Sequence, residues 1–227
     1  MKIVVSGTSI MMNNLSFVRI MQKRLGCEIM NLARVGCGNQ YIHDSVIAEV
    51  TERPTDLVMV QWTVPNRVEF RTQYDTGLFD WEMYGGNSNE HLLQRDWMWP
   101  HTPDHTVPSP ETAVSKNAMF ESRFKFTPGV YANHQTMLTQ IISLQSVLKS
   151  YNIPYVFIFY RKLLQLKQFT QYYDRIDWSN VHDQNLFRIS KDRGWWNDDS
   201  YHPTASAYEY YADEMIKYLN TKNLIVP

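Results

Sequence analysis

Residues that cooperate in acyl transfer occur close together near the end of the chain. The segment 197–219, NDDSYHPTASAYEYYADEMIKYL, places Asp199 three residues before His202. Helix capping explains such a segment equally well, because Asp, Asn and Ser cap helices and Pro suits a first turn. A general-base histidine needs a carboxylate on its Nδ1–H, and a tight turn can bring Asp199 to the ring. The segment therefore predicts a catalytic pair if the chain also supplies a nucleophile.

A serine at the end of the first expected strand is the candidate nucleophile. The apolar run KIVVSG, residues 2–7, is followed closely by Ser9. A serine at a strand-to-helix turn can point its hydroxyl into a crevice while adjacent backbone N–H groups face a developing anion. The alternative is that Thr8 or Ser9 is an ordinary turn residue.

Donors for such an anion follow the next two expected strands. Gly36 in VGCGNQ could supply a backbone N–H to an oxyanion, although a plain turn would also require glycine. Thr63, Asn66 and Arg67 follow the apolar run TDLVMVQW, with loop capping as the alternative role. Together with Ser9 and the Asp-x-x-His segment, these residues make a complete set for acyl transfer.

The elements that must position these residues alternate along the chain. Buried strands are expected at 2–7, 27–33, 55–62 and 154–160, and helices at 14–25, 40–50, 131–152, 183–193 and from Pro203 to about residue 219. Alternating strands and helices predict a parallel α/β sheet with right-handed crossovers. Ligands bind such sheets beyond the carboxyl ends of the strands, where the candidate residues lie. An apolar stripe that includes Tyr208 and Leu219 should hold the last helix against the sheet.

A long stretch interrupts this alternation. Residues 68–128 show no clear periodicity but are rich in aromatic residues, Pro, Asn, Thr and Ser. We expect an irregular insertion within one domain that spans residues 1–227. Its aromatic rings suit either sugar stacking or core packing, because each ring buries a large apolar area.

Composition narrows the classes of partner. The 227 residues are 44% hydrophobic and 20% charged, with a net charge of −1. The lack of a basic block argues against nucleic acid, and the lack of a signal segment or of an apolar run of about 18 residues argues against a membrane. We expect a cytoplasmic protein whose Cys27 and Cys37 are reduced, buried thiols.

These motifs resemble those of the SGNH (GDSL-like) hydrolases. Gly7-Thr8-Ser9 matches the Gly-Asp-Ser block with Thr in place of Asp, and Asp199 to Pro203 matches the Asp-x-x-His-Pro block fully. Asn31 and Gly36 stand in the relation of the second block, and GCGN is similar to its Gly-x-Ser-Asn. The third block departs, since QWTVPNR replaces Gly-x-Asn-Asp and resembles a variant found in bacteriophages and marine bacteria.

The resemblance implies a flavodoxin-like three-layer α/β/α sandwich with a parallel central sheet and a serine esterase activity. Ser9 would be the nucleophile, His202 the general base and Asp199 its orienting carboxylate. The N–H groups of Ser9 and Gly36 would bind the oxyanion, aided by Asn66 or Thr63. Substrate contacts are expected from Trp62, Arg67 and Tyr201.

The expected substrate is a small-molecule or glycan ester, most specifically a short acyl group such as O-acetyl on a carbohydrate. No metal or cofactor is expected, and His101, Asp104 and His105 are interpreted as solvated loop residues. The main alternative is a non-catalytic structural or carbohydrate-binding protein with the same fold, located on the virion if a phage encodes it. A nucleotide-binding role is disfavoured because no Gly-x-Gly-x-x-Gly or Walker-type loop occurs.

Overall fold

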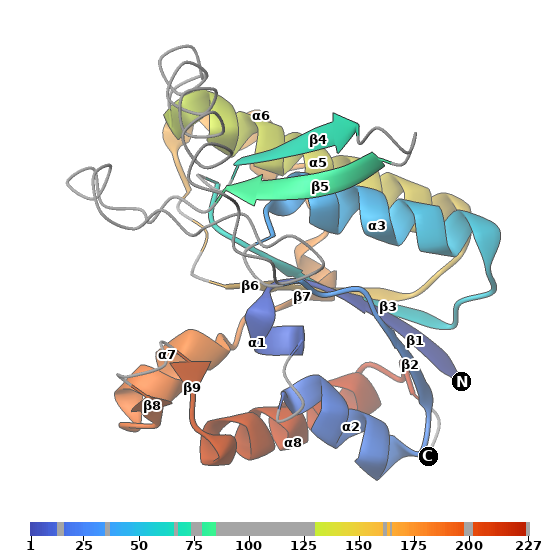
Figure 1. Cartoon of the computed structure of the whole chain (residues 1–227), viewed down its shortest axis with the longest axis vertical. Coiled ribbons are helices and arrows are strands. Elements are labelled where there is room, and N and C mark those ends of the chain that lie inside the picture. Colours follow the sequence, from blue (N-terminus) through green and yellow to red (C-terminus); the bar gives the residue numbers. More distant parts are fainter. Residues whose placement is uncertain are drawn as a thin grey trace.

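The fold is given by a computed structural model (Figure 1). It describes residues 1–12, 16–34, 37–65, 68–73, 79–84, 130–160, 163, 165–197 and 202–225. Side chains are described for all of these except 68–73, 79–84, Val130 and Asn197. Of the predicted site residues, Gly36, Asn66, Arg67, Asp199 and Tyr201 lie outside the described residues, as do His101, Asp104 and His105.

A five-stranded parallel sheet forms the centre of the molecule. Its strands are β1 (Lys2–Ser6), β2 (Glu28–Asn31), β3 (Leu57–Trp62), β6 (Tyr155–Phe159) and β7 (Val181–His182), in the spatial order β2-β1-β3-β6-β7. The register pairs Val4 with Val58 and Val58 with Tyr155. The chain adds β2 on one side of β1 and then β3 on the other, so the strand order reverses between β1 and β3. A crevice is expected beyond the carboxyl ends of these two strands.

Helices cover both faces of this sheet, as the two helical layers in Figure 1 show. One layer contains α1 (Ser9–Met12), α2 (Phe17–Leu25), α7 (Leu186–Asp192) and α8 (Ala205–Thr221). The other contains α3 (Asn39–Glu52), α5 (Val130–Ser150) and the short η2 (Lys167–Phe169) and α6 (Thr170–Tyr173). The sequence expectation of a three-layer sandwich with a parallel sheet is confirmed.

Strand alternation explains how one apolar run serves both layers. In β3, Leu57 and Met59 pack with α2 and α8, whereas Val58 and Trp62 pack with α3 and α5. Successive side chains of a strand point to opposite faces, so a strand covered on both sides is apolar at nearly every position. All six residues of β3 are buried.

The last helix is anchored by the stripe that the sequence predicts. Tyr208, Tyr211 and Leu219 are buried, and the Tyr211 ring meets Phe17 of α2 edge-on at 4.9 Å. The expected helix start at Pro203 is wrong. Pro203 belongs to the two-residue strand β9 (His202–Pro203), and α8 begins after the N-cap residue Thr204.

The stretch that was expected to be irregular contains a β-hairpin. Strands β4 (Val68–Gln73) and β5 (Phe79–Tyr84) pair antiparallel, with Val68 opposite Tyr84. Strand β4 contacts α3, and the hairpin lies over the α3–α5 layer in Figure 1.

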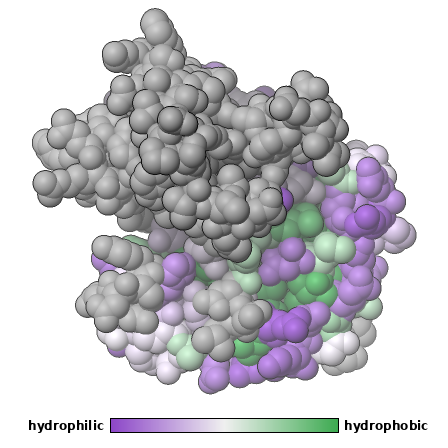
Figure 2. Space-filling model, viewed as in Figure 1, coloured by the Kyte–Doolittle hydropathy of each residue, from purple (hydrophilic) through white to green (hydrophobic). Residues whose placement is uncertain are grey.

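The described surface is ordinary in its polarity on the face drawn in Figure 2. Hydrophobic residues of the described part gather near the middle of this face, with hydrophilic residues around them. Within the described ranges, no helix is long and apolar enough to cross a bilayer. Cys37 is a buried thiol as expected, but Cys27 is only half-buried, which corrects the expectation for that residue. Partial burial raises the pKa of the Cys27 thiol.

Candidate active site

Gly7 shapes the turn that carries the candidate nucleophile. A Cβ atom at this position would lie 2.5 Å from Met11 Sδ and 2.9 Å from Gln61 Cβ, so only glycine fits. The Gly7 carbonyl accepts hydrogen bonds from Arg34 N and from Cys37 Sγ, both at 3.0 Å. The end of β1 is thereby fastened to the β2–α3 connection.

Ser9 and His202 meet beyond the end of β1. Ser9 is the first residue of α1, and its Oγ lies 3.0 Å from His202 Nε2. Both residues are half-buried, so the pair is held by the fold while solvent can still reach it. An imidazole nitrogen at this distance from a serine hydroxyl can act as its general base.

A short hairpin positions His202. Strand β9 pairs antiparallel with β8 (Trp196–Asn197), with His202 opposite Asn197. The next backbone amide, Thr204 N, donates to Trp195 O at 2.8 Å. These bonds fix the backbone of His202 immediately before α8 begins.

An arginine stacks the hairpin onto α8. The Arg193 guanidinium lies 4.0 Å from the ring centroid of Tyr210 and 4.9 Å from that of Trp195. Arginine over an aromatic face is attracted by the ring quadrupole. This stack adds a side-chain link between α8 and the loop that enters β8.

A buried side-chain pair links the nucleophile loop to β3. Thr8 Oγ1 donates to Gln61 Oε1 at 2.9 Å, and both residues are almost fully buried. Thr8 is the position at which the resembling family has Asp. Here a neutral hydroxyl bonded to a neutral amide holds the loop, so no charge is buried beside Ser9.

Asn39 clamps the turn that follows β3. Its Oδ1 accepts from Thr63 N at 2.9 Å, and its Nδ2 lies 3.4 Å from Thr63 O and 3.3 Å from Val64 O. The amide of Asn39 thus satisfies a donor and two acceptors of one turn. Because Asn39 begins α3, the clamp connects the β2–α3 and β3 loops at the carboxyl edge of the sheet.

Of the two candidates for a side-chain oxyanion donor, Thr63 is the one whose position the structure describes. It is 3% exposed, and no described residue forms a hydrogen bond with its Oγ1. A buried hydroxyl without a partner is costly unless it has another task. Trp62, by contrast, is fully buried in the core against Phe157, with ring centroids 5.6 Å apart. The expectation that Trp62 contacts substrate does not fit this burial, because strand alternation points its side chain into the α3–α5 layer.

Sequence reasoning missed three residues that organise the site. Gln61 and Asn39 hold the loops after β1 and β3, and Asn185 holds the end of β6 by donating to Phe159 O and Tyr160 O at 2.6 Å each. Asn39 could have been found from the GCGN motif. Gln61 carries a weaker signal, as the one polar residue within an otherwise apolar strand.

Comparison with known proteins places this arrangement in a fold family. No family model matches the sequence, and no curated protein sequence does so. Solved structures do match. TesA gives a TM-score of 0.54 at 11% identity, covering 99% of this chain and 100% of that one. An acetyl xylan esterase, AlAXEase, gives 0.50 at 11% identity, covering 96% and 100%.

A third solved structure carries the family name. It is a protein from Desulfitobacterium hafniense DCB-2 described as lipolytic and of the G-D-S-L family, with a TM-score of 0.51 at 10% identity, covering 95% of this chain and 98% of that one. Identities this low leave the catalytic residues of this chain to be judged from its own geometry. The five parallel strands in the order β2-β1-β3-β6-β7, matched over nearly the whole chain, are the fold of the SGNH (GDSL) hydrolases.

Proposed function

We propose that this chain is a serine hydrolase of carboxylic esters with Ser9 as its nucleophile. The observation that carries the proposal is the 3.0 Å separation of Ser9 Oγ and His202 Nε2 at the carboxyl edge of the sheet. The two residues are 193 positions apart in the sequence, so the fold itself must bring them together. A serine and a histidine in hydrogen-bond contact form the core of a nucleophile–base pair.

The reaction follows from this pair. His202 Nε2 takes the Ser9 hydroxyl proton as Oγ forms a bond to the ester carbonyl carbon. The protonated ring then returns that proton to the leaving alcohol oxygen as the ester C–O bond breaks. Water next gives a proton to His202 and attacks the acyl carbon, and breakage of the Oγ–acyl bond restores Ser9 and releases the acid. Asp199 would hold the Nδ1–H of His202 throughout.

The oxyanion would be bound by the backbone N–H groups of Ser9 and Gly36, with a side-chain donor after β3. Thr63 or Asn66 would be that third donor. The Oγ1 of Thr63 supports Thr63, because no acceptor among the described residues takes its proton. Loss of one oxyanion donor typically slows turnover by about 10²–10³-fold.

The proposed substrate is a short acyl ester, such as O-acetyl, on a carbohydrate. The acetyl xylan esterase whose fold this chain shares supports that class of substrate. Arg67 and Tyr201 are proposed as contacts for the alcohol portion. Trp62 is left out because it is buried in the core.

The test uses p-nitrophenyl acetate, which needs no sugar contact. Ser9→Ala and His202→Ala should each lower kcat/KM by more than about 10³-fold, and Asp199→Asn should also slow turnover strongly. Ser150→Ala, which changes an exposed serine on α5, is the matched control and should leave the rate unaltered. Equal activity in the Ser9 or His202 variant would overturn the assignment.

A phosphonate probe separates an enzyme from a binding protein with the same fold. Covalent labelling of Ser9 in the native chain, lost in Ser9→Ala and in His202→Ala, is the expected result. If glycans bind while Ser9 stays unlabelled, the chain is a binding protein instead.

A further inference from the structure

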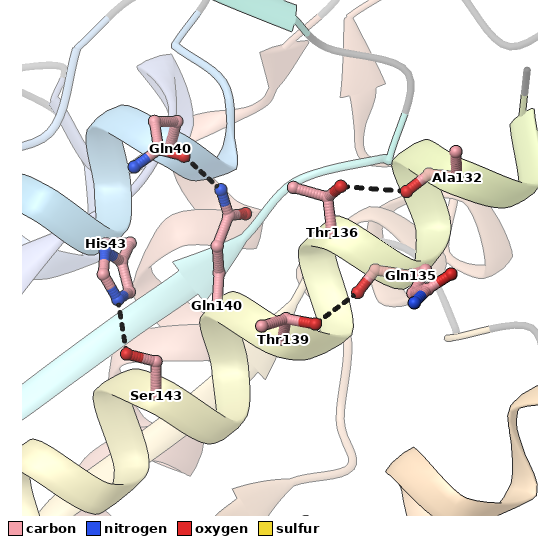
Figure 3. Close-up of a pocket in the computed structure, with 8 residues that line it drawn as sticks. All are labelled: Gln40, His43, Ala132, Gln135, Thr136, Thr139, Gln140 and Ser143. Carbon is pink, nitrogen blue, oxygen red and sulfur yellow. Dashed lines mark hydrogen bonds between the residues drawn. The ribbon is translucent and has the colours of Figure 1, made fainter. Parts of the chain in front are cut away.

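A hollow lies between α3 and α5, and neither Ser9 nor His202 is among its described lining residues. It encloses about 520 Å³, within the range of sites for small ligands. Figure 3 shows that its side chains come from the N-terminal part of α3 and the first half of α5. The polar ones that carry the argument are Gln40, His43, Gln135, Thr139, Gln140 and Ser143.

A carboxylate beside the hollow fixes the direction of its hydrogen bonds. Both oxygens of Asp44 accept from Gln40 Nε2 at 2.9 Å, so the carbonyl of Gln40 must face the other way. That carbonyl accepts from Gln140 Nε2 at 2.7 Å. The Gln140 side chain is only 8% exposed and is oriented by this bond. Its own carbonyl oxygen accepts no hydrogen bond from the described residues.

The same carboxylate sets the histidine. Asp44 Oδ1 lies 2.6 Å from His43 Nδ1, which makes Nδ1 the donor, and His43 Nε2 can then accept the Ser143 hydroxyl proton at 3.1 Å. This leaves Ser143 Oγ with free lone pairs. Figure 3 shows the Gln40–Gln140 and His43–Ser143 hydrogen bonds, and the Asp44 carboxylate, which bonds both Gln40 and His43, links the two pairs into one wall of the hollow.

The unused capacity of the hollow is polar and neutral. The Gln135 side-chain amide donates to Tyr172 OH, and Thr139 Oγ1 donates to the backbone carbonyl of Gln135. The Gln135 side-chain oxygen and the Thr139 oxygen can therefore still accept. The Gln140 and Gln135 amides each keep one N–H. None of the described lining residues is Lys, Arg, Asp or Glu. Among the described lining residues a phosphate or carboxylate would find no Lys or Arg, whereas a sugar hydroxyl both donates and accepts.

The hollow shares an edge of the sheet with the crevice. Helices that connect parallel strands run opposite to them, so the N-terminal turns of α3 and α5 lie at the carboxyl edge. Gln40 directly follows Asn39, which holds the turn at Thr63 after β3. Strand β3 is next to β1, which leads to Ser9, at a spacing of about 4.8 Å. Gln40 is thus connected, through Asn39 and the Thr63 turn, to the strand beside the one that leads to Ser9.

We propose that the hollow between α3 and α5 is a subsite for unesterified sugar units of a neutral glycan whose ester group lies at Ser9. Only the placement of the ester group at Ser9 rests on the proposed esterase function. Sugar binding in the hollow can be measured without turnover. The ligand class is a neutral, hydroxyl-rich oligosaccharide.

The experiment measures binding of xylohexaose by titration calorimetry to the full chain. Thr139→Trp fills the hollow from an exposed helix position, and Thr136→Trp does so from another if the first variant fails to fold. Ser150→Trp is the matched control, because Thr139 and Ser150 are both exposed on α5 and each bonds a carbonyl of the preceding turn. We expect the tryptophan in the hollow to weaken binding by at least about tenfold and the control to bind normally.

Two charged hexasaccharides test the ligand class. Hexagalacturonate and the glucosamine hexamer should bind at least about tenfold more weakly than the neutral probe. Binding of xylohexaose that Thr139→Trp and Thr136→Trp leave unchanged, or a preference for either charged probe, would overturn the proposal. So would the absence of binding by xylohexaose and by cellohexaose.

Activity separates this proposal from the first one. If the chain hydrolyses p-nitrophenyl acetate, the ratio of kcat/KM for acetylated xylohexaose to that for the aryl ester should fall at least about tenfold in Thr139→Trp. An unchanged ratio would overturn the link between hollow and crevice. If no ester is hydrolysed but neutral sugar binding is lost in Thr139→Trp, the subsite stands and the esterase function falls.

Discussion

The Asn39 side chain bonds both the backbone N–H and the backbone carbonyl of Thr63. Asn39 Oδ1 takes the Thr63 N–H at 2.9 Å, while Asn39 Nδ2 faces the Thr63 and Val64 carbonyls. The contact ties the start of α3 to the end of β3 in a chain whose third family block is altered. The clamp holds this loop in a chain that has QWTVPNR where the resembling family has Gly-x-Asn-Asp.

Asn39→Ala should destabilise the fold and slow ester hydrolysis together. The substitution leaves the Thr63 N–H and two carbonyls without partners, which costs about 1–3 kcal/mol for each buried group that water does not reach. A turn displaced by about 1 Å can lower turnover by about 10²-fold. Urea unfolding and kcat on an aryl acetate measure the two effects.

Asn220→Ala, at an exposed position of α8, is the control for Asn39→Ala and should change neither quantity. Full activity of Asn39→Ala at normal stability would show that the Thr63 turn keeps its place without the clamp.

Gly7→Ala should be more harmful than substitution at a glycine with a left-handed backbone. The added Cβ would lie 2.5 Å from Met11 Sδ and 2.9 Å from Gln61 Cβ, in a buried site. Overpacking of this kind costs about 1–3 kcal/mol and would shift the loop that carries Ser9.

Gly26 provides the comparison, because its φ is 57° but no atom lies within 4 Å of the Cβ position. Asn tolerates that conformation, so Gly26→Asn should change the free energy of unfolding much less. Thermal unfolding of the two variants decides the matter, and equal losses would contradict the crowding at Gly7.

Stability should fall as the pH is lowered below about 7, in part through His182. Burial lowers the pKa of His182 below its ordinary value of 6.5, outweighing the Gln184 carbonyl and the Asp183 and Glu214 charges, which raise it. The folded state thus binds fewer protons than the unfolded state between the lowered pKa and 6.5. The contribution is complete above 6.5 and is lost as the pH falls through that window.

His182→Asn should flatten this pH dependence. The Asn amide can replace the Nδ1–H that faces the Gln184 carbonyl at 3.1 Å, but it does not titrate. The difference in slope is at most about 1.4 kcal/mol per pH unit. Some dependence should remain, because burial also lowers the pKa of His134. Chemical unfolding at a series of pH values would reveal identical slopes if His182 played no part.

The parts of the fold that the sequence predicts are those with strong periodicity. The apolar runs became β1, β3 and β6, and the stripe of Tyr208 and Leu219 became the buried face of α8. These signals are strong because a strand buried on both faces, or a helix packed on a sheet, must be apolar at fixed intervals.

Elements set by tertiary pairing escaped prediction. Strand β7 is two residues long and exists only because it pairs with β6, and Pro203 joins β9 because Thr204 N bonds the Trp195 carbonyl. From the sequence alone, Trp62 could be either a core side chain or a substrate contact. In the site, the types and order of Ser9 and His202 were readable, whereas the Thr8–Gln61 contact depends on strand adjacency.

Thr63→Val tests whether the Thr63 hydroxyl serves catalysis. Valine has almost the same shape, and the hydroxyl that it removes is buried with no hydrogen-bond partner among the described residues. If Oγ1 had no role, its loss would leave stability unchanged or improve it, and turnover would stay the same. As an oxyanion donor, the hydroxyl would instead be needed only in the transition state.

We therefore expect Thr63→Val to lower kcat by about 10²-fold at equal or higher stability, with little change in KM. Thr63→Ser keeps the hydroxyl and should retain most of the activity, which excludes an effect of packing alone. Asn66→Ala, made in parallel, tests the rival donor. If Asn66→Ala shows the kinetic loss and Thr63→Val does not, the oxyanion donor after β3 is Asn66.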